Sequence, residues 1–233
     1  MNRVAEAVRR SLIEPAAPAS AVSALALRRR RAVVIATLVA GTITLGILLR
    51  VKPGDVWFYP LAVVQASIWA AGGLLSGPLH LGSIASDRGP HRPVLAPVVI
   101  GVALGAVFLI GALIVREIPP LRDYVADVLG FADGSALVAA TVVTVANGVA
   151  EEMFFRGAVF AAIERRRPVL VSTLIYGATT VATGNPTLVF AAIIVGSILG
   201  LQRRASGGIM APAITHVTWS LIMLFTLPPI LRM

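Results

Sequence analysis

Two adjacent glutamates interrupt an otherwise apolar stretch of this chain. Glu151 and Glu152, with Arg156 just after them, lie in the run 136–163, which is long enough to cross a lipid bilayer. A charged side chain at mid-depth costs about 2.5–3.5 kcal/mol or more, and such residues normally face the bundle interior and serve a function there. A buried carboxylate can act as a general base on water, and a structural ion pair is the other explanation.

Helix geometry separates the two glutamates. Glu152 and Arg156 are four residues apart, so they share a face in the favourable order for an ion pair. Glu151 points about 100° away from that face, because a helix has 3.6 residues per turn. Asn147 lies one turn earlier on the face of Glu151. We therefore assign Glu151 to chemistry, with Asn147 orienting it, and Glu152 with Arg156 to structure or substrate orientation.

Other polar residues lie at a similar depth in other apolar segments. Counted from the basic boundary at 1.5 Å per residue, Glu151 lies at about 20 Å. On the same rule Thr180 lies at about 18 Å, Ser220 at about 20 Å and His216 at about 14 Å. The sequence thus predicts a shared polar site of Glu151, Thr180, His216 and Ser220 from three helices.

The composition indicates which elements hold this site. The chain is 57% hydrophobic and 13% charged, whereas soluble domains carry about 25% charged residues. We therefore expect lipid to cover an all-α, polytopic transmembrane bundle of about seven spans. The expected spans are about 32–50, 57–75, 94–115, 136–163, 168–183, 187–201 and 207–227. The fifth and sixth are short, and the Gly184-Asn185-Pro186 turn predicts that they form a hairpin within the bundle.

The net charge of +9 is best explained by membrane topology, and no nucleic-acid partner is expected. Of the 20 basic residues, 14 fall in segments 1–31, 76–93, 164–167 and 202–206, 5 fall at the opposite ends, and Arg156 lies within a span. This bias favours a multi-pass plasma-membrane protein with a cytoplasmic N-terminus and an outside C-terminus. The preference for arginine over lysine hints at a GC-rich bacterial genome.

The domain layout follows from the same pattern. Residues 1–31 form a basic cytoplasmic N-terminal segment, and residues 32–233 form one integral membrane domain. In the first segment Val4, Val8 and Leu12 fall at helical spacing. A surface helix and a disordered tail are both compatible with that pattern. Segment 116–135 is expected to hold a short amphipathic helix.

Two motifs resemble a known family. The run from Glu151 to Gly157 reads EEMFFRG and resembles the EExxxR motif of the CPBP family, the CAAX-prenyl-protease and bacteriocin-processing (Abi) intramembrane proteases. The run from His216 to Ser220 resembles the HxxxN motif of that family. The resemblance covers about residues 136–228. It implies an endopeptidase whose first glutamate activates water together with a histidine of a middle motif, FxxxH.

The middle motif departs from the family. Tyr176 stands where phenylalanine is usual, Thr180 where the histidine is usual, and Ser220 where the last motif has asparagine. The resemblance implies zinc as a possible cofactor, but a catalytic zinc usually has three protein ligands. Glu151 and His216 are the remaining candidates, and the chain has no cysteine.

A metal-free mechanism therefore fits the residues better. Glu151 would deprotonate a water held by Thr180, and His216 with Ser220 would donate hydrogen bonds to the oxyanion.

Three functions remain open at this point. The first is an intramembrane endopeptidase acting in the lipid bilayer on a peptide or membrane-protein segment, since a bacterium would not supply prenylated CAAX proteins. The second is a catalytically weak or inactive relative that serves as an immunity, binding or scaffold protein, for which Thr180 is the evidence. The third is a proton-coupled carrier, because buried carboxylates also serve proton relays. The lack of an internal repeat counts against the carrier.

Overall fold

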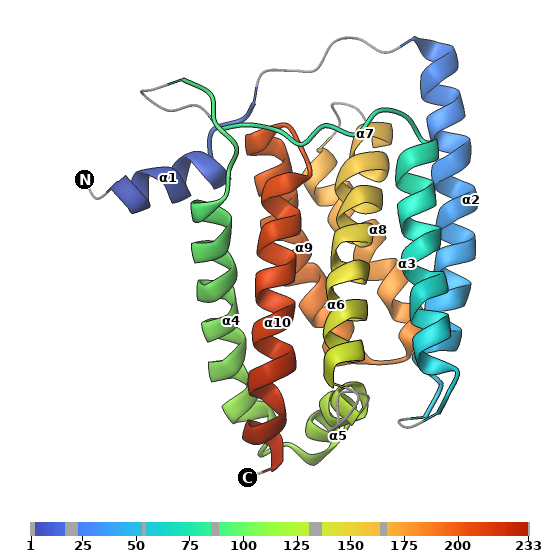
Figure 1. Ribbon diagram of the computed structural model, residues 1–233, viewed down its shortest axis with the longest axis vertical. Coiled ribbons are helices and arrows are strands. Elements are labelled where there is room, and N and C mark those ends of the chain that lie inside the picture. The colour runs from blue at the N-terminus through green and yellow to red at the C-terminus, as the bar shows by residue number, and fades with distance from the viewer. Residues whose placement is uncertain are drawn as a thin grey trace.

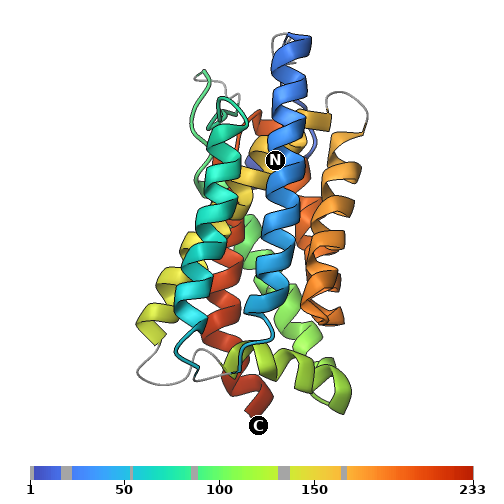
Figure 2. The ribbon, with the colours of Figure 1, turned by 90° about the vertical axis from the view of Figure 1, so that its right-hand side faces the viewer.

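The computed structural model describes residues 3–16, 23–52, 55–84, 89–130, 137–163 and 167–232. These residues form a bundle of helices (Figures 1 and 2). The elements are α1 (Arg3–Leu12), α2 (Ala24–Leu48), α3 (Phe58–Leu75), α4 (Leu95–Val115), α5 (Pro119–Leu129), α6 (Leu137–Glu151), the π-helix η3 (Glu152–Val159), α7 (Phe160–Ile163), α8 (Pro168–Thr180), the 3₁₀-helix η4 (Val181–Thr183), α9 (Pro186–Ser206) and α10 (Met210–Arg232).

The predicted polytopic bundle is confirmed. Among the described residues, six helices are long and apolar enough to cross a membrane, and Pro168–Thr183 is a shorter apolar one. Three spans differ most from expectation, and one of them is the last, α10, which runs from Met210 to Arg232 rather than over about 207–227. The first span, α2, begins at Ala24 rather than near 32, so it includes Arg30, which is buried and whose Nε donates to the carbonyl of Ser76 at 3.2 Å. The sixth span, α9, is longer than expected and ends at Ser206.

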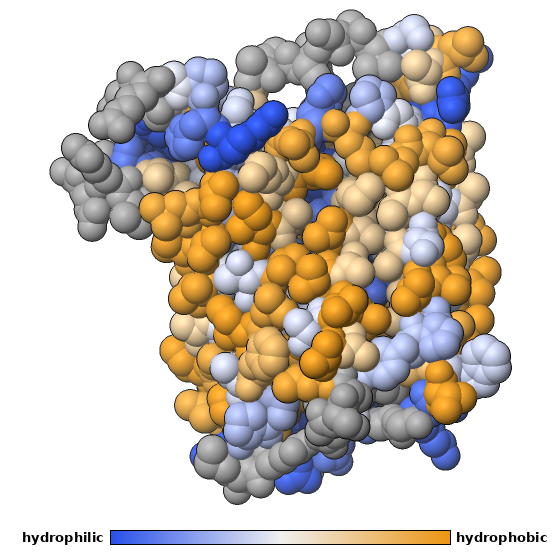
Figure 3. Space-filling view, viewed as in Figure 1, coloured by the Kyte–Doolittle hydropathy of each residue, from blue (hydrophilic) through white to orange (hydrophobic). Residues whose placement is uncertain are grey.

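Apolar side chains cover the outside of the bundle. On α2, Ile35, Val39, Ile43 and Ile47 are all exposed at a spacing of four residues, so they form one outward stripe. Figure 3 shows a broad hydrophobic surface between two more hydrophilic ends. The expected hairpin of α8 and α9 also presents apolar side chains outward, including Phe190. This surface is the one that lipid would cover.

Two short helices lie across opposite ends of the bundle (Figure 1). Of the two alternatives left open for the N-terminal segment, a surface helix and a disordered tail, the structure shows a helix, α1. It packs against α9 and α4, with Ser11 fully buried. The helix α5 confirms the predicted amphipathic helix and lies at the end that holds the C-terminus.

Of the residues used for the charge bias, Arg88, Arg165 and Arg166 lie outside the described residues.

An aromatic cluster joins α3 to the helix that carries the glutamates. Trp69 stacks on Phe154 with ring centroids 4.8 Å apart, and Phe155 lies 5.1 Å from the same ring. The far edge of the indole fills the space left by the missing side chain of Gly41 on α2. This packing fixes the height and rotation of the segment that follows Glu151.

The glutamate helix changes register directly after Glu151. From Glu152 to Val159 it is a π-helix, and at its end the amide of Phe160 donates to the carbonyl of Phe155, five residues earlier. The side chain of Arg203 on α9 supplies a donor to the carbonyl of Arg156 at 2.7 Å. Single-turn π segments are frequent at functional sites.

The close fit of Trp69 on Gly41 gives a stability prediction. A Cβ at Gly41 would overlap the indole ring of Trp69, so Gly41→Ala should cost about 1–3 kcal/mol by overpacking. This outweighs the gain of up to about 1 kcal/mol that alanine brings to a helix interior. Thermal unfolding in detergent should show a lower midpoint for this variant.

The matched control is Gly111→Ala on α4, where no atom lies within 4 Å of the added Cβ. That variant should unfold at the wild-type temperature or slightly above it. Equal midpoints for the two variants would contradict the packing described for Trp69.

Candidate active site

Glu152 is the anchor of a buried charge network. Its Oε1 accepts a hydrogen bond from Nη1 of Arg156 at 2.8 Å, and both side chains are almost completely buried. Nη2 of Arg156 also donates to the carbonyl of Gly196 on α9 at 3.1 Å. The guanidinium carbon lies 4.9 Å from the ring centre of Tyr176. The predicted pairing of Glu152 with Arg156 is therefore confirmed.

His216 joins this network rather than Glu151. Its Nδ1 lies 2.9 Å from Oε1 of Glu152, within hydrogen-bond distance. The sequence placed His216 beside Glu151, because the two lie at similar depth. The depth of a residue does not determine how its helix is rotated about its own axis. In the structure, the rotation of α10 points the imidazole toward Glu152. One oxygen of Glu152 thus has two nitrogen partners, on its own helix and on α10.

Glu151 has a different surrounding. It is half-buried, and its Oε2 accepts a hydrogen bond from the hydroxyl of Tyr176 at 2.6 Å. Asn147 was expected to orient Glu151, but its amide donates to the carbonyls of Ala62 and Val143 at 3.1 and 2.9 Å. Asn147 therefore ties α6 to α3, and Tyr176 on α8 is the residue that holds Glu151.

Sequence reasoning did not assign a role to Tyr176. The signal was present, because a tyrosine stands where phenylalanine is usual in the middle motif. The added hydroxyl supplies a donor that phenylalanine lacks. The tyrosine ring also stays within the aromatic cluster, with its centroid 4.7 Å from that of Phe155.

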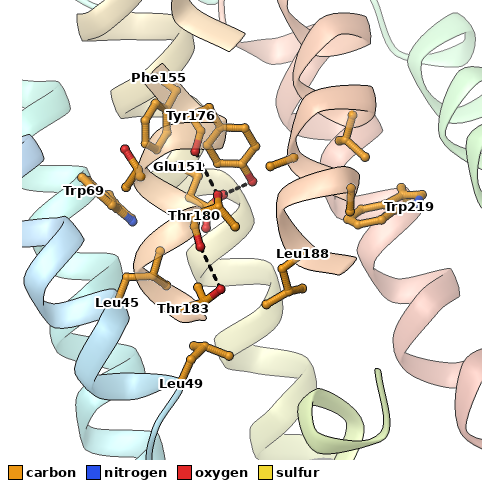
Figure 4. Close-up of a pocket in the computed structure, with 14 residues that line it drawn as sticks. Leu45, Leu49, Trp69, Glu151, Phe155, Tyr176, Thr180, Thr183, Leu188 and Trp219 are labelled. Carbon is orange, nitrogen blue, oxygen red and sulfur yellow. Dashed lines mark hydrogen bonds between the residues drawn. The ribbon is translucent and has the colours of Figure 1, made fainter. Parts of the chain in front are cut away.

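A cavity of about 140 Å³ opens beside Glu151. Figure 4 shows Glu151, Tyr176 and Thr180 on one part of its wall and Trp69 on another, with the indole nitrogen turned toward the enclosed space. Leu45, Leu49 and Leu188 make much of the rest of the wall apolar. A partly exposed carboxylate in a mainly apolar cavity is a typical candidate for a catalytic base.

Thr180 shares this cavity as predicted. Its Oγ1 donates to the carbonyl of Tyr176 at 2.9 Å, one helical turn earlier. The hydroxyl proton is therefore engaged, while the oxygen lone pairs remain able to accept a hydrogen bond from a water.

Ser220 is not part of the wall of this cavity. The cavity wall includes Trp219 from α10 but not Ser220, since consecutive residues point about 100° apart on a helix. No side-chain hydrogen bond of Ser220 occurs among the described residues. Of the four predicted groups, Glu151 and Thr180 thus line one cavity, His216 contacts Glu152, and Ser220 does neither.

The donor set does not fit a catalytic zinc ion. In the described part of the chain, no three His, Cys, Asp or Glu side chains lie close enough together to hold a metal. Oε1 of Glu152 is already shared by Arg156 and His216, and a threonine occupies position 180. Three protein ligands are usual for such an ion.

Comparison with known families agrees with the motifs. Residues 133–222 match the model of the Rce1-like type II CAAX prenyl endopeptidases. The match covers less than half of the chain, and it is consistent with the CPBP family that the motifs resemble. The matched segment holds Glu151, Glu152, Tyr176, Thr180 and His216, while the helices α1 to α5 precede it. No curated protein and no solved structure gives a match to the chain.

The buried network gives a second prediction. Arg156→Met would leave Glu152 buried without its cation, and this should lower the free energy of unfolding by about 3–5 kcal/mol. Adding Glu152→Gln to the same chain should recover much of that loss, because the uncompensated charge is then gone. A double-mutant cycle by denaturation in detergent measures both effects.

The exposed pair of Arg116 and Glu117 provides the control. Arg116→Met should change stability by less than about 1 kcal/mol, as is usual for surface pairs. If Arg156→Met were equally mild, the network would not be a structural anchor.

Proposed function

We propose that this protein is an intramembrane endopeptidase of the CPBP type, in which Glu151 activates water to hydrolyse a peptide bond. The observation that carries the proposal is the difference between the two glutamates. Glu152 is paired with Arg156, whereas Glu151 faces a cavity and has only a hydroxyl as its hydrogen-bond partner among the described residues. A carboxylate placed in this way can take a proton from water.

The proposed step uses the groups on the cavity wall. A water between Glu151 and Thr180 gives its proton to the glutamate, and the resulting hydroxide attacks the peptide carbonyl. The carbonyl becomes a tetrahedral oxyanion, and Glu151 then passes the proton to the leaving amine as the C–N bond breaks. Tyr176 keeps the carboxylate in place through its 2.6 Å hydrogen bond.

The oxyanion needs a donor on the cavity wall. His216 and Ser220, which the sequence suggested for this role, do not line the cavity. The indole nitrogen of Trp69 faces the enclosed space, and the packing of its ring holds it there (Figure 4). We therefore assign the oxyanion donor to Trp69.

The lining also supports a class of substrate. Leucine side chains from α2 and α9 surround the space beside Glu151, so an apolar residue of a peptide or membrane-protein segment fits it. The surrounding lipid bilayer would present such segments to the bundle. The charge bias supports an orientation with the α1 end in the cytoplasm.

A non-catalytic binding protein is the second candidate. Thr180 replaces the histidine of the middle motif, and its hydroxyl proton is used in a helix-internal bond to Tyr176. Such a protein would keep the Glu152 network and hold a peptide without cleaving it.

The test that separates the candidates is Glu151→Gln. This variant keeps the shape of the side chain but cannot accept the proton, so the cleavage rate of a membrane peptide in proteoliposomes should fall about 10²–10⁴-fold. Glu117→Gln, on an exposed glutamate, is the matched control and should leave the rate unchanged. Full cleavage by Glu151→Gln would rule out this base, and peptide binding without turnover in the wild type would favour the second candidate.

Tyr176→Phe tests how Glu151 is held. The substitution removes the hydroxyl while keeping the ring against Phe155, and a hydrogen bond to a charged group contributes about 1.5–3 kcal/mol. We expect kcat to fall about ten- to hundredfold with little change in KM, because the lost hydroxyl is engaged by the proposed base Glu151.

The control is Tyr59→Phe, at the start of α3 and outside the cavity wall. It should show wild-type kinetics. A rise in KM alone for Tyr176→Phe would instead place the tyrosine in substrate binding.

A further inference from the structure

A second cavity lies at the α5 end of the bundle. Its volume is about 250 Å³, and it lies between the end of α2, the helix α5 and the turn from η4 to α9. Arg50, Lys52 and Asp127 give its wall a charged character, unlike the apolar cavity beside Glu151. We call this second cavity the vestibule and the first the inner cavity.

The two cavities adjoin. Leu49 and Thr183 belong to the walls of both, so these side chains are the boundary between the vestibule and the inner cavity. Figure 4 shows both residues on the side of the inner cavity away from Phe155. The polarity therefore falls from the charged vestibule, past Leu49 and Thr183, to the apolar space at Glu151.

The opposite direction is filled with side chains. Phe154, Phe155 and Leu199 are each at most 1% exposed, and they pack around the π-helix toward the α1 end. A peptide that approached Glu151 from that end would have to displace this core, which is costly in a close-packed interior.

The wall of the vestibule is held by one asparagine. Asn185 Nδ2 donates to the carbonyl of Tyr124 on α5 at 2.7 Å, while its Oδ1 accepts from the amide of Thr187 at the start of α9. These bonds join α5 to the α9 turn, so α5 is attached beside the vestibule through its own backbone.

We propose that water and substrate reach Glu151 through the vestibule, from the α5 end. We further propose that the substrate places an apolar side chain in the inner cavity and an anionic continuation near Arg50 and Lys52. A dry cavity of about 150 Å³ can hold benzene, so 140 Å³ suits one aromatic or branched aliphatic side chain. With the predicted topology, the α5 end is the outside.

The substrate part of this inference rests on the proposed function, whereas the access route does not. The route can be tested without turnover, because the chain contains no cysteine and single-cysteine variants have no background. Leu49→Cys reports the boundary, and Ala191→Cys reports the inner cavity. Val56→Cys marks the α5 end, and Ile13→Cys marks the α1 end, since both native side chains are exposed.

The probe is a charged, membrane-impermeant methanethiosulfonate added to one side of oriented membranes. We expect Leu49→Cys and Ala191→Cys to react only from the side that labels Val56→Cys. Their rates should exceed by at least about tenfold that of Ala150→Cys, a neighbour of Glu151 packed in the core, because the thiol must be solvated and reachable to react. Labelling only from the Ile13→Cys side, or at the rate of Ala150→Cys, would overturn the route.

The substrate part is tested by binding to Glu151→Gln, which should hold a peptide without cleaving it. Two peptides with the same apolar residue, followed by either glutamate or glutamine, are compared. The glutamate peptide should bind about fivefold tighter at low salt, and the double variant Arg50→Gln/Lys52→Gln should remove this preference.

Arg116→Gln, an exposed arginine outside the vestibule wall, should keep the preference. Equal binding of the two peptides to the parent would overturn the anionic assignment. Loss of the proposed function has a different signature, namely normal labelling and binding in a wild type that never cleaves either peptide.

Discussion

One oxygen of Glu152, shared by Arg156 and His216, is the contact on which the rest of the site depends. Removing two charges from water costs several kcal/mol per ion, and only close, well-directed partners offset that cost. Arg156 extends the contact to α9 through the carbonyl of Gly196, and His216 extends it to α10. Through Arg156 and His216, the buried carboxylate of Glu152 therefore links the π-helix η3 to α9 and α10.

The π-helix and the aromatic cluster fix the position of Glu151 relative to this network. The change of register begins at Glu152, so Glu151 is the last residue with α-helical geometry before it. Trp69, Phe154 and Phe155 pack around the altered turn, and Gly41 admits the indole. Tyr176 uses both properties of its side chain, since its ring belongs to this cluster and its hydroxyl holds Glu151.

Hydrolysis inside a membrane needs water where lipid excludes it. An apolar cavity alone stays dry, and a buried water needs two to four polar partners. Glu151, Tyr176 and Thr180 provide such partners at the inner cavity, and the charged vestibule adjoins it at Leu49 and Thr183. The structure thus places an apolar cavity beside a more polar one.

The sequence alone predicted most of the spanning helices. Apolar runs of sufficient length predicted the spans, and the four-residue spacing of Glu152 and Arg156 predicted their ion pair, because both depend on geometry within one helix. Counting residues at 1.5 Å each also placed Thr180 at the level of Glu151.

Only the tertiary structure decided which side chains face each other. Rise along a helix gives height, but the rotation of each helix depends on packing against its neighbours. That rotation sends His216 to Glu152, Asn147 to Ala62 and Trp219 to the cavity in place of Ser220. It also brings Tyr176 to Glu151, 25 residues away in the chain, a contact that no local spacing could predict.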